Sequence, residues 1–349
     1  MRSILRYMPT EMMDDVALYL PRGDTVMLMR TCRKLHDIGA RVLYRNVALS
    51  DLRARLFFRT IAENSMMYAS AVKSLHYTAM SNEDVFLTYS MFCDAILNLE
   101  ELRSLTLTIP LSISSLLHHQ LVRRSVIRSN MFHPTTHTDF LPKLECISLN
   151  GNILLSELAK FRCTTNVCMT YMMDAKDIKE FVSCIADGGT NTVLSDMVIT
   201  LHPSTASPLR KTMLMLDSAV PNLQTLVIRT PSANALEASE TLAAFPPIFR
   251  SLRKFCLNDW SILDAVFMTN EDEAIRLQRT HIDLSADMRG NLEDLAFGPV
   301  HWERTMTRAY IKWTVHKAQT QSASSYDVAP ESVDLPLFWE VFYIAPPRH

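Results

Sequence analysis

A short apolar pattern that recurs along most of this 349-residue chain constrains its fold more than any other feature. The pattern is apolar-x-x-apolar-x-apolar, and its first copy is Val72-Lys-Ser-Leu-His-Tyr77. Alternate residues of a strand point to one face, so the last two apolar residues are expected to point inward while the first anchors the preceding turn. Further copies start at residues 102, 144, 223, 252 and 292, and weaker copies start at 164 and 194.

The spacing of the copies indicates a repeat with insertions, because most intervals between them are 29 or 30 residues. Apolar residues at helical spacing lie between the copies, so strand and helix alternate, and we predict an α/β fold with a parallel sheet. Asn150 and Asn258 directly follow two of the strands. The predicted helices span residues 83–97, 120–128, 177–186, 208–218, 233–244, 272–279 and 302–319.

This alternation resembles an irregular leucine-rich-repeat solenoid, in which an asparagine follows the strand. The resemblance implies a parallel sheet on the concave side and helices on the convex side. The positions between the inward residues would then point out of the concave face and are candidates for binding a protein substrate. These candidates are Thr106, Ser148, Asn150, Val227, Arg229, Lys254, Asn258 and Asp294.

A separate helical segment precedes the repeats. Proline is well placed to begin a helix at Pro9, and the acidic Glu11 favours the positive end of the helix dipole. The spacing predicts a helix over residues 9–20, with Met12, Val16 and Leu20 on one apolar stripe. A second helical run is predicted after a turn, with Asp24 at its start and apolar residues at 28, 32, 35 and 38.

This segment resembles an F-box, because Met8-Pro9-Thr10-Glu11, Cys32-Arg33-Lys34-Leu35 and Leu43-Tyr44 follow one another in the order of that family. Methionine stands at Met8 where the family usually has leucine. The resemblance implies binding to a Skp-type adaptor and, through it, to a cullin ubiquitin ligase, with this chain selecting the protein substrate. The residues implied to contact the adaptor are Met8, Pro9, Glu11, Val16, Leu20, Leu28, Cys32, Leu35, Leu43 and Tyr44.

The predicted domain order follows from these two features. Residues 1–50 form an F-box-like helical domain, 51–71 a connecting helix, and 72–319 the repeats. Residues 320–349 form a polar loop and a C-terminal cap, in which the apolar segment 335–344 covers the last repeat.

Composition limits the function classes. The formal net charge is -2 with 21% charged residues, which gives no electrostatic signature of nucleic-acid or membrane-surface binding. No apolar run approaches the length of a membrane span, and no secretory leader is recognisable. The 7 cysteines are dispersed and odd in number, as expected of reduced thiols in a cytoplasmic or nuclear protein.

Candidate chemistry in the chain is weak. His133 and His137 have a spacing that zinc sites use, but Pro134 prevents a regular helix through the pair, and Cys163 and Cys168 lack a second cysteine pair. We therefore expect no enzymatic activity, no cofactor and no metal. Two other hypotheses stay open: a repeat scaffold outside any ligase, with the N-terminal helices as its cap, and a metal-assisted hydrolase using scattered histidines and carboxylates.

Overall fold

The computed structural model describes residues 8–317 except 64–67, 81–83, 128–139, 161, 188, 203–208, 231–248, 260–275, 277–278, 280–290, 298–299 and 307–310. The chain divides into two compact units, Met1–Lys317 and Ala318–His349, and all described residues belong to the first. The predicted cap at 335–344 and the predicted helix at 233–244 therefore lie outside the described residues. No described helix is long and apolar enough to cross a membrane.

The chain begins with three helices, α1 (Thr10–Leu18), α2 (Arg22–Met29) and α3 (Arg33–Arg45). The prediction of one continuous second helix was wrong, because the backbone becomes extended at Cys32 and separates α2 from α3. Asp24 does not cap α2. The helix starts after Pro21, whose fixed φ suits a helix start, and no side chain caps this end.

An eleven-stranded sheet follows, and its strands are ordered along the sheet as they are along the chain. Neighbouring strands are parallel from β1 to β9, and β10 is antiparallel to both of its neighbours, β9 and β11. The strands are β1 (Asn46–Ser50), β2 (Ser74–Thr78), β3 (Ser104–Thr108), β4 (Cys146–Asn150), β5 (Asn166–Met173), β6 (Asp196–Leu201), β7 (Thr225–Thr230), β8 (Lys254–Asp259), β9 (Asp294–Phe297), β10 (Val300–Met306) and β11 (Ile311–Lys317).

The α/β class and the parallel sheet are thus confirmed, and the eight copies of the apolar pattern all become strands, β2 to β9. Each strand starts two residues after the first residue of its copy. The two inward residues of every copy pair in register with those of the next, as Leu75 does with Leu105 and Tyr77 with Leu107. β1 was missed although Tyr44, Val47 and Leu49 follow the same spacing, because Tyr44 was assigned to the F-box-like segment.

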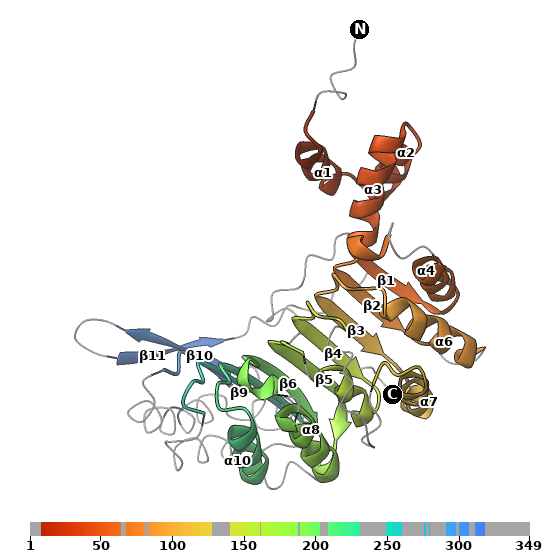
Figure 1. Ribbon diagram of the computed structural model, residues 1–349. Coiled ribbons are helices and arrows are strands. Elements are labelled where there is room, and N and C mark those ends of the chain that lie inside the picture. The colour runs from red at the N-terminus through yellow and green to blue at the C-terminus, as the bar shows by residue number, and fades with distance from the viewer. Residues whose placement is uncertain are drawn as a thin grey trace. The chain divides into compact units, whose positions relative to one another are not determined.

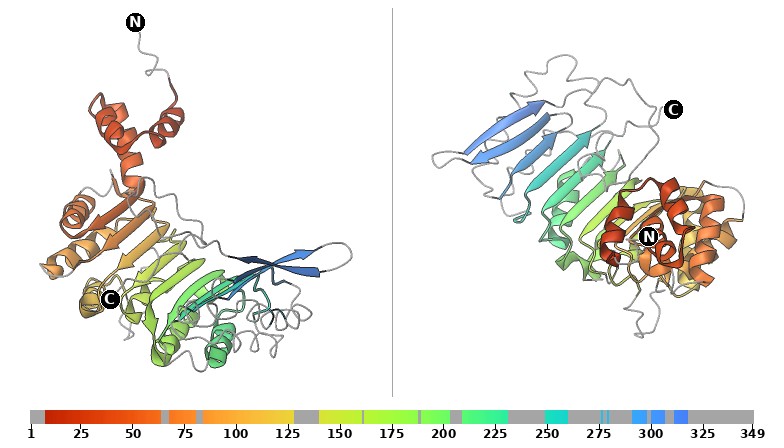
Figure 2. Two further views of the ribbon diagram at one scale, coloured as in Figure 1. Left: turned by 180° about the vertical axis from the view of Figure 1, so that it is seen from behind. Right: turned by 90° about the horizontal axis from the view of Figure 1, so that it is seen from above.

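Helices lie along one face of this sheet, as Figure 1 and the reverse view in Figure 2 show. The inward rows of the strands and the apolar sides of these helices form one continuous core that extends from Ala54 to Trp313. The predicted helix at 120–128 was misplaced, because the helix in this region spans Leu111–Arg123. The elements are α4 (Asp51–Glu63), η2 (Ala69–Ala71), α6 (Val85–Ile96), α7 (Leu111–Arg123), η3 (Ile153–Leu158), α8 (Ala175–Asp187), η4 (Thr190–Thr192) and α10 (Leu209–Ala219).

The prediction of a helix over 302–319 was wrong. The segment forms the antiparallel hairpin β10–β11, and Trp302 and Trp313 are buried in the main core. Aromatic and β-branched residues at alternate positions, such as Trp313 and Val315, favour a strand.

Candidate binding surfaces

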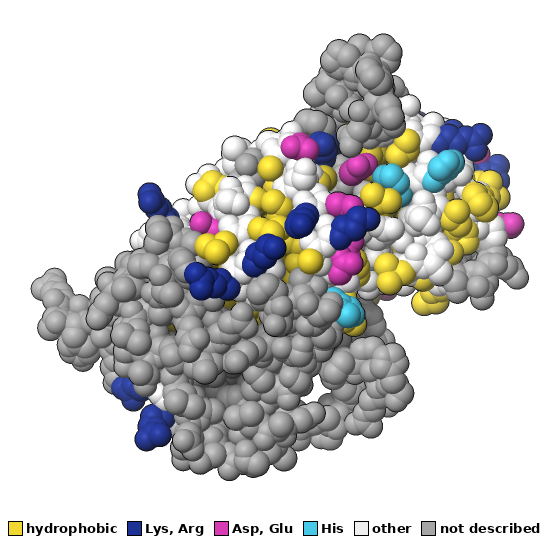
Figure 3. All heavy atoms as spheres, turned by 90° about the horizontal axis from the view of Figure 1, so that it is seen from below, with side chains coloured by type: hydrophobic (Ala, Val, Ile, Leu, Met, Phe, Trp, Pro, Cys, Tyr) yellow, Lys and Arg dark blue, Asp and Glu magenta, His cyan; other side chains and the backbone are white. Residues whose placement is uncertain are grey.

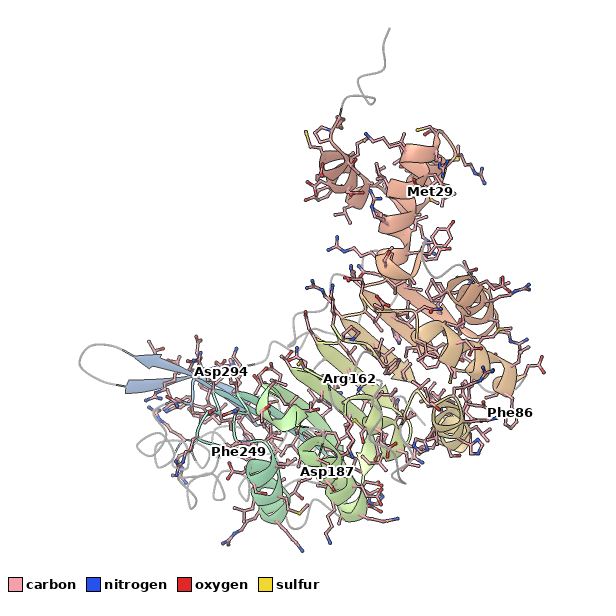
Figure 4. All side chains as sticks on the ribbon, viewed as in Figure 1. Met29, Phe86, Arg162, Asp187, Phe249 and Asp294 are labelled. Carbon is pink, nitrogen blue, oxygen red and sulfur yellow. The ribbon has the colours of Figure 1, made fainter. Side chains whose placement is uncertain are left out.

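The three N-terminal helices have a hydrophobic cluster of their own, formed by Met13, Ala17, Leu35 and Ile38 and separate from the main core. Gly39 brings α3 close to α2: a Cβ atom there would lie 2.4 Å from Cγ of Met29, which Figure 4 labels. The helices therefore form a small packed unit, which Figure 1 shows beyond β1.

Polar contacts also tie α1 to α3. The Arg41 guanidinium donates to both carboxylate oxygens of Asp14, at 2.8 and 3.1 Å. Lys34 Nζ donates to the backbone oxygen of Met8 at 3.1 Å, which holds the segment before α1 against α3. Both ion-pair partners are partly exposed, so their contribution to stability is small, at about 0–1 kcal/mol.

The structure separates the ten predicted adaptor-binding residues into three groups. Pro9, Glu11, Val16 and Cys32 are exposed, and Met8, Leu20, Leu28 and Leu43 are half-buried. Leu35 is buried inside the small cluster, and the half-buried Tyr44 stacks on Tyr68, with ring centroids 4.7 Å apart.

Several large apolar side chains of this helical unit are exposed. On α1, Met12, Val16 and Tyr19 are 54%, 57% and 89% exposed, and their spacing of four and three residues places them on one stripe. On α2, Val26 and Met27 are exposed as well. Sequence reasoning placed Met12 on an apolar stripe but did not separate the residues that pack inward from those that face solvent.

A second candidate surface is the face of the sheet opposite the helices. Residues two apart along a strand share a face, and the register aligns them across strands. One row runs through Ser104, Cys146, Thr225 and Lys254 and a second through Thr106, Ser148 and Val227. A third contains Thr108 beside Asn150 and Arg229 beside Asn258. All eight predicted substrate-binding positions therefore lie on this face.

The eight positions do not share one environment. Val227 has no exposed surface, so its prediction as a solvent-facing contact was wrong, and its neighbours Val198 and Cys256 in the same row are buried too. Arg229, Lys254 and Asp294 are half-buried, and the side chain of Asn258 lies outside the described residues. Thr106, Ser148 and Asn150 lie in β3 and β4, where the face is accessible to solvent.

Charged groups around Asp294 neutralise one another. Lys254 Nζ lies 3.0 Å from the Asp294 carboxylate and His301 Nε2 lies 3.6 Å from it, and Figure 4 labels Asp294 on β9. Hydrogen bonds from His301 and Lys254 lower the pKa of Asp294. On the face that Figure 3 shows, described basic side chains are interspersed with acidic and apolar ones, so no patch of one charge stands out there.

The described residues give little support for a catalytic or metal-binding site. Those residues contain no group of three or more His, Cys, Asp or Glu side chains arranged to hold a metal ion. Burial raises the pKa of the Cys93 and Cys256 thiols to about 12, which keeps them protonated and unreactive near neutral pH. His118 pairs with Glu157 at 3.1 Å, while His133 and His137 lie outside the described residues.

Comparison with known proteins does not indicate a function for these surfaces. No protein-family model and no curated protein matches the chain.

Proposed function

We propose that this chain is the substrate-binding subunit of a Skp-cullin-F-box ubiquitin ligase. α1–α3 form its F-box and bind the adaptor, and the strand and helix repeats form a leucine-rich-repeat solenoid that holds a protein substrate. No residue of the chain takes part in bond chemistry under this proposal.

The observation that carries the proposal is the exposed stripe of Met12, Val16 and Tyr19 on a helical unit that already has its own core. Large apolar side chains facing water at helical spacing are suited to a partner, because burying them contributes roughly 25 cal/mol per Å². Pro9 and Glu11, which carry part of the family resemblance, are also exposed beside this stripe.

The experiment is co-purification of the full chain with a Skp-type adaptor. Replacing Val16 with Lys places a charge in the centre of the stripe without touching a buried residue, and we expect at least a tenfold loss of adaptor binding. Phe86→Lys is the matched control, since Phe86 is 59% exposed against 57% for Val16 but lies on α6. Failure of the unmodified chain to bind, or equal binding by both variants, would refute the proposal.

A repeat scaffold acting outside any ligase is the second candidate, and one observation favours it. Tyr44, at the end of α3, packs against Phe57 and Tyr68 of the main core, and α3 leads directly into β1. The helices then serve as a cap on the first strand. Under this alternative Val16→Lys leaves every interaction of the chain unchanged, so the same experiment separates the two.

A further inference from the structure

The accessible part of the sheet face has an unusual composition. Three rows over β1 to β5 give fifteen outward positions, of which fourteen are aligned by register and Thr170 continues the alternation of β5; none of them carries Asp, Glu, Lys or Arg. We call these fifteen positions the neutral lattice. They are Asn46, Ala48, Ser50, Ser74, His76, Thr78, Ser104, Thr106, Thr108, Cys146, Ser148, Asn150, Asn166, Cys168 and Thr170.

Small side chains dominate the neutral lattice, and most of them carry a hydroxyl or an amide. In a chain that is 21% charged, fifteen surface positions would be expected to carry about three charged residues. The side chains of Thr106, Thr108 and Asn150 make no hydrogen bond with other described residues. Their donors and acceptors are therefore available to a partner lying on the sheet.

Several charges at the border of the neutral lattice are already paired. Residues directly before the strands carry them: Lys73 and Lys143 both bond to the Glu101 carboxylate, and Arg103 lies 3.5 Å from Glu145. A phosphorylated segment needs unpaired arginines or lysines to neutralise it, and the neutral lattice supplies none. Arg45, directly before β1, is also exposed at this border, so the preference for an uncharged partner rests on the fifteen lattice positions themselves.

Resting on the proposed function, we infer that the neutral lattice binds an extended, uncharged and unphosphorylated polypeptide segment of the substrate. Extended polypeptide repeats every two residues at roughly 6.6 Å, which is the spacing between the rows of the lattice. Alternate side chains of such a segment can therefore meet successive rows. The hydroxyl and amide groups of the lattice satisfy its polar groups without the desolvation of a charge.

The test uses the purified full chain and random twelve-residue peptides displayed on phage. Enriched sequences are then synthesised with and without one phosphoserine, and their affinities are measured by fluorescence anisotropy. We expect enriched peptides with net charge near zero, and at least a tenfold loss of affinity on phosphorylation. Enrichment of acidic or basic peptides, no enrichment at all, or tighter binding of the phosphorylated form would overturn the inference.

Two variants locate the binding on the lattice. Ser148→Arg introduces a charge at its centre and is expected to weaken peptide binding at least tenfold, while Ser115→Arg, at an exposed position of α7, leaves affinity unchanged. Thr106→Val removes one hydroxyl but keeps the shape and strand preference, so it provides a folded variant in case the arginine disturbs the sheet. Its expected loss is at least threefold, and unchanged affinity in both lattice variants contradicts the inference.

Adaptor co-purification is measured on the same protein preparations. Loss of peptide selection with intact adaptor binding refutes only the neutral lattice, whereas peptide selection without adaptor binding refutes only the ligase assignment. Binding of a glycan array in place of peptides would also overturn the inference.

Discussion

The described residues form two hydrophobic clusters of very different extent. The main core receives two inward rows from the strands and the apolar side of each helix, so that every repeat is buried by its neighbours. The cluster of α1–α3 has only Met13, Ala17, Leu35 and Ile38, each contributing at most about 1.5–3 kcal/mol. The difference indicates that the sheet with its helices is stable by itself. The helical unit of α1–α3 depends for its stability on its attachment to the sheet or on a partner.

The largest expected effect lies in the main core. Phe58 is fully buried and makes edge-to-face contacts with Tyr77 and Phe92, with centroid distances of 5.3 and 5.2 Å. Phe58→Ala should lower the free energy of unfolding by about 3–5 kcal/mol, because it leaves a cavity where α4, β2 and α6 meet. Urea denaturation followed by tryptophan fluorescence measures it.

The control for this change lies on the same helix. Leu56 is 64% exposed on α4, so Leu56→Ala should change the free energy of unfolding by less than about 0.5 kcal/mol. Similar losses in both variants would show that α4 does not pack as described.

A partner should stabilise the helical unit and not the sheet. If the adaptor binds only folded α1–α3, a free concentration one hundred times the dissociation constant stabilises them by about 2.7 kcal/mol. Hydrogen exchange of the amides in Thr10–Arg45 should slow accordingly, while exchange in β3 to β7 stays unchanged. Equal slowing in both regions would mean that the two clusters unfold together.

Packing inside the helical unit gives a smaller effect. A Cβ atom at Gly39 would meet Cγ of Met29 at 2.4 Å and the backbone oxygen of Thr25 at 3.3 Å. Gly39→Ala should therefore destabilise α2 against α3 by about 1–3 kcal/mol, seen as faster proteolysis within α1–α3. Gly23→Ala is the control: nothing lies within 4 Å, and alanine favours the helix by about 0.5–1 kcal/mol.

How far the sequence predicts this structure depends on how specific each spacing is. The repeated pattern located β2 to β9 because both inward residues, such as Leu105 and Leu107, must fill the same core. It misread 302–319 because a spacing of four residues, as between Arg304 and Arg308, fits one turn of helix and two pleats of a strand equally well. The alternation of Trp313 and Val315 favours the strand, and the pairing of β10 with β11 shows it.

The candidate surfaces were predicted to a similar degree. Alternation along a strand assigns a residue to a face, and it assigned all eight substrate positions correctly to the face opposite the helices. It does not give exposure, which is why Val227 was misjudged. In the N-terminal segment, the family resemblance named Leu35 and Tyr44 as contacts, whereas tertiary packing buries Leu35 and joins Tyr44 to the main core.

The smallest expected effect concerns the ion pairs at the start of β2 and β3. Hydrogen bonds from Lys143 and Lys73 lower the pKa of Glu101 to about 2, from 4.5 when unfolded. Because the folded pKa is the lower one, the stabilisation is present above pH 4.5 and is lost as the pH falls toward 2. Glu101→Gln should remove less than about 1 kcal/mol at pH 7, since the lysines are partly exposed and screened by salt. The difference in unfolding midpoint between wild type and Glu101→Gln should shrink below pH 4.5, and a constant difference down to pH 2 would contradict this assignment.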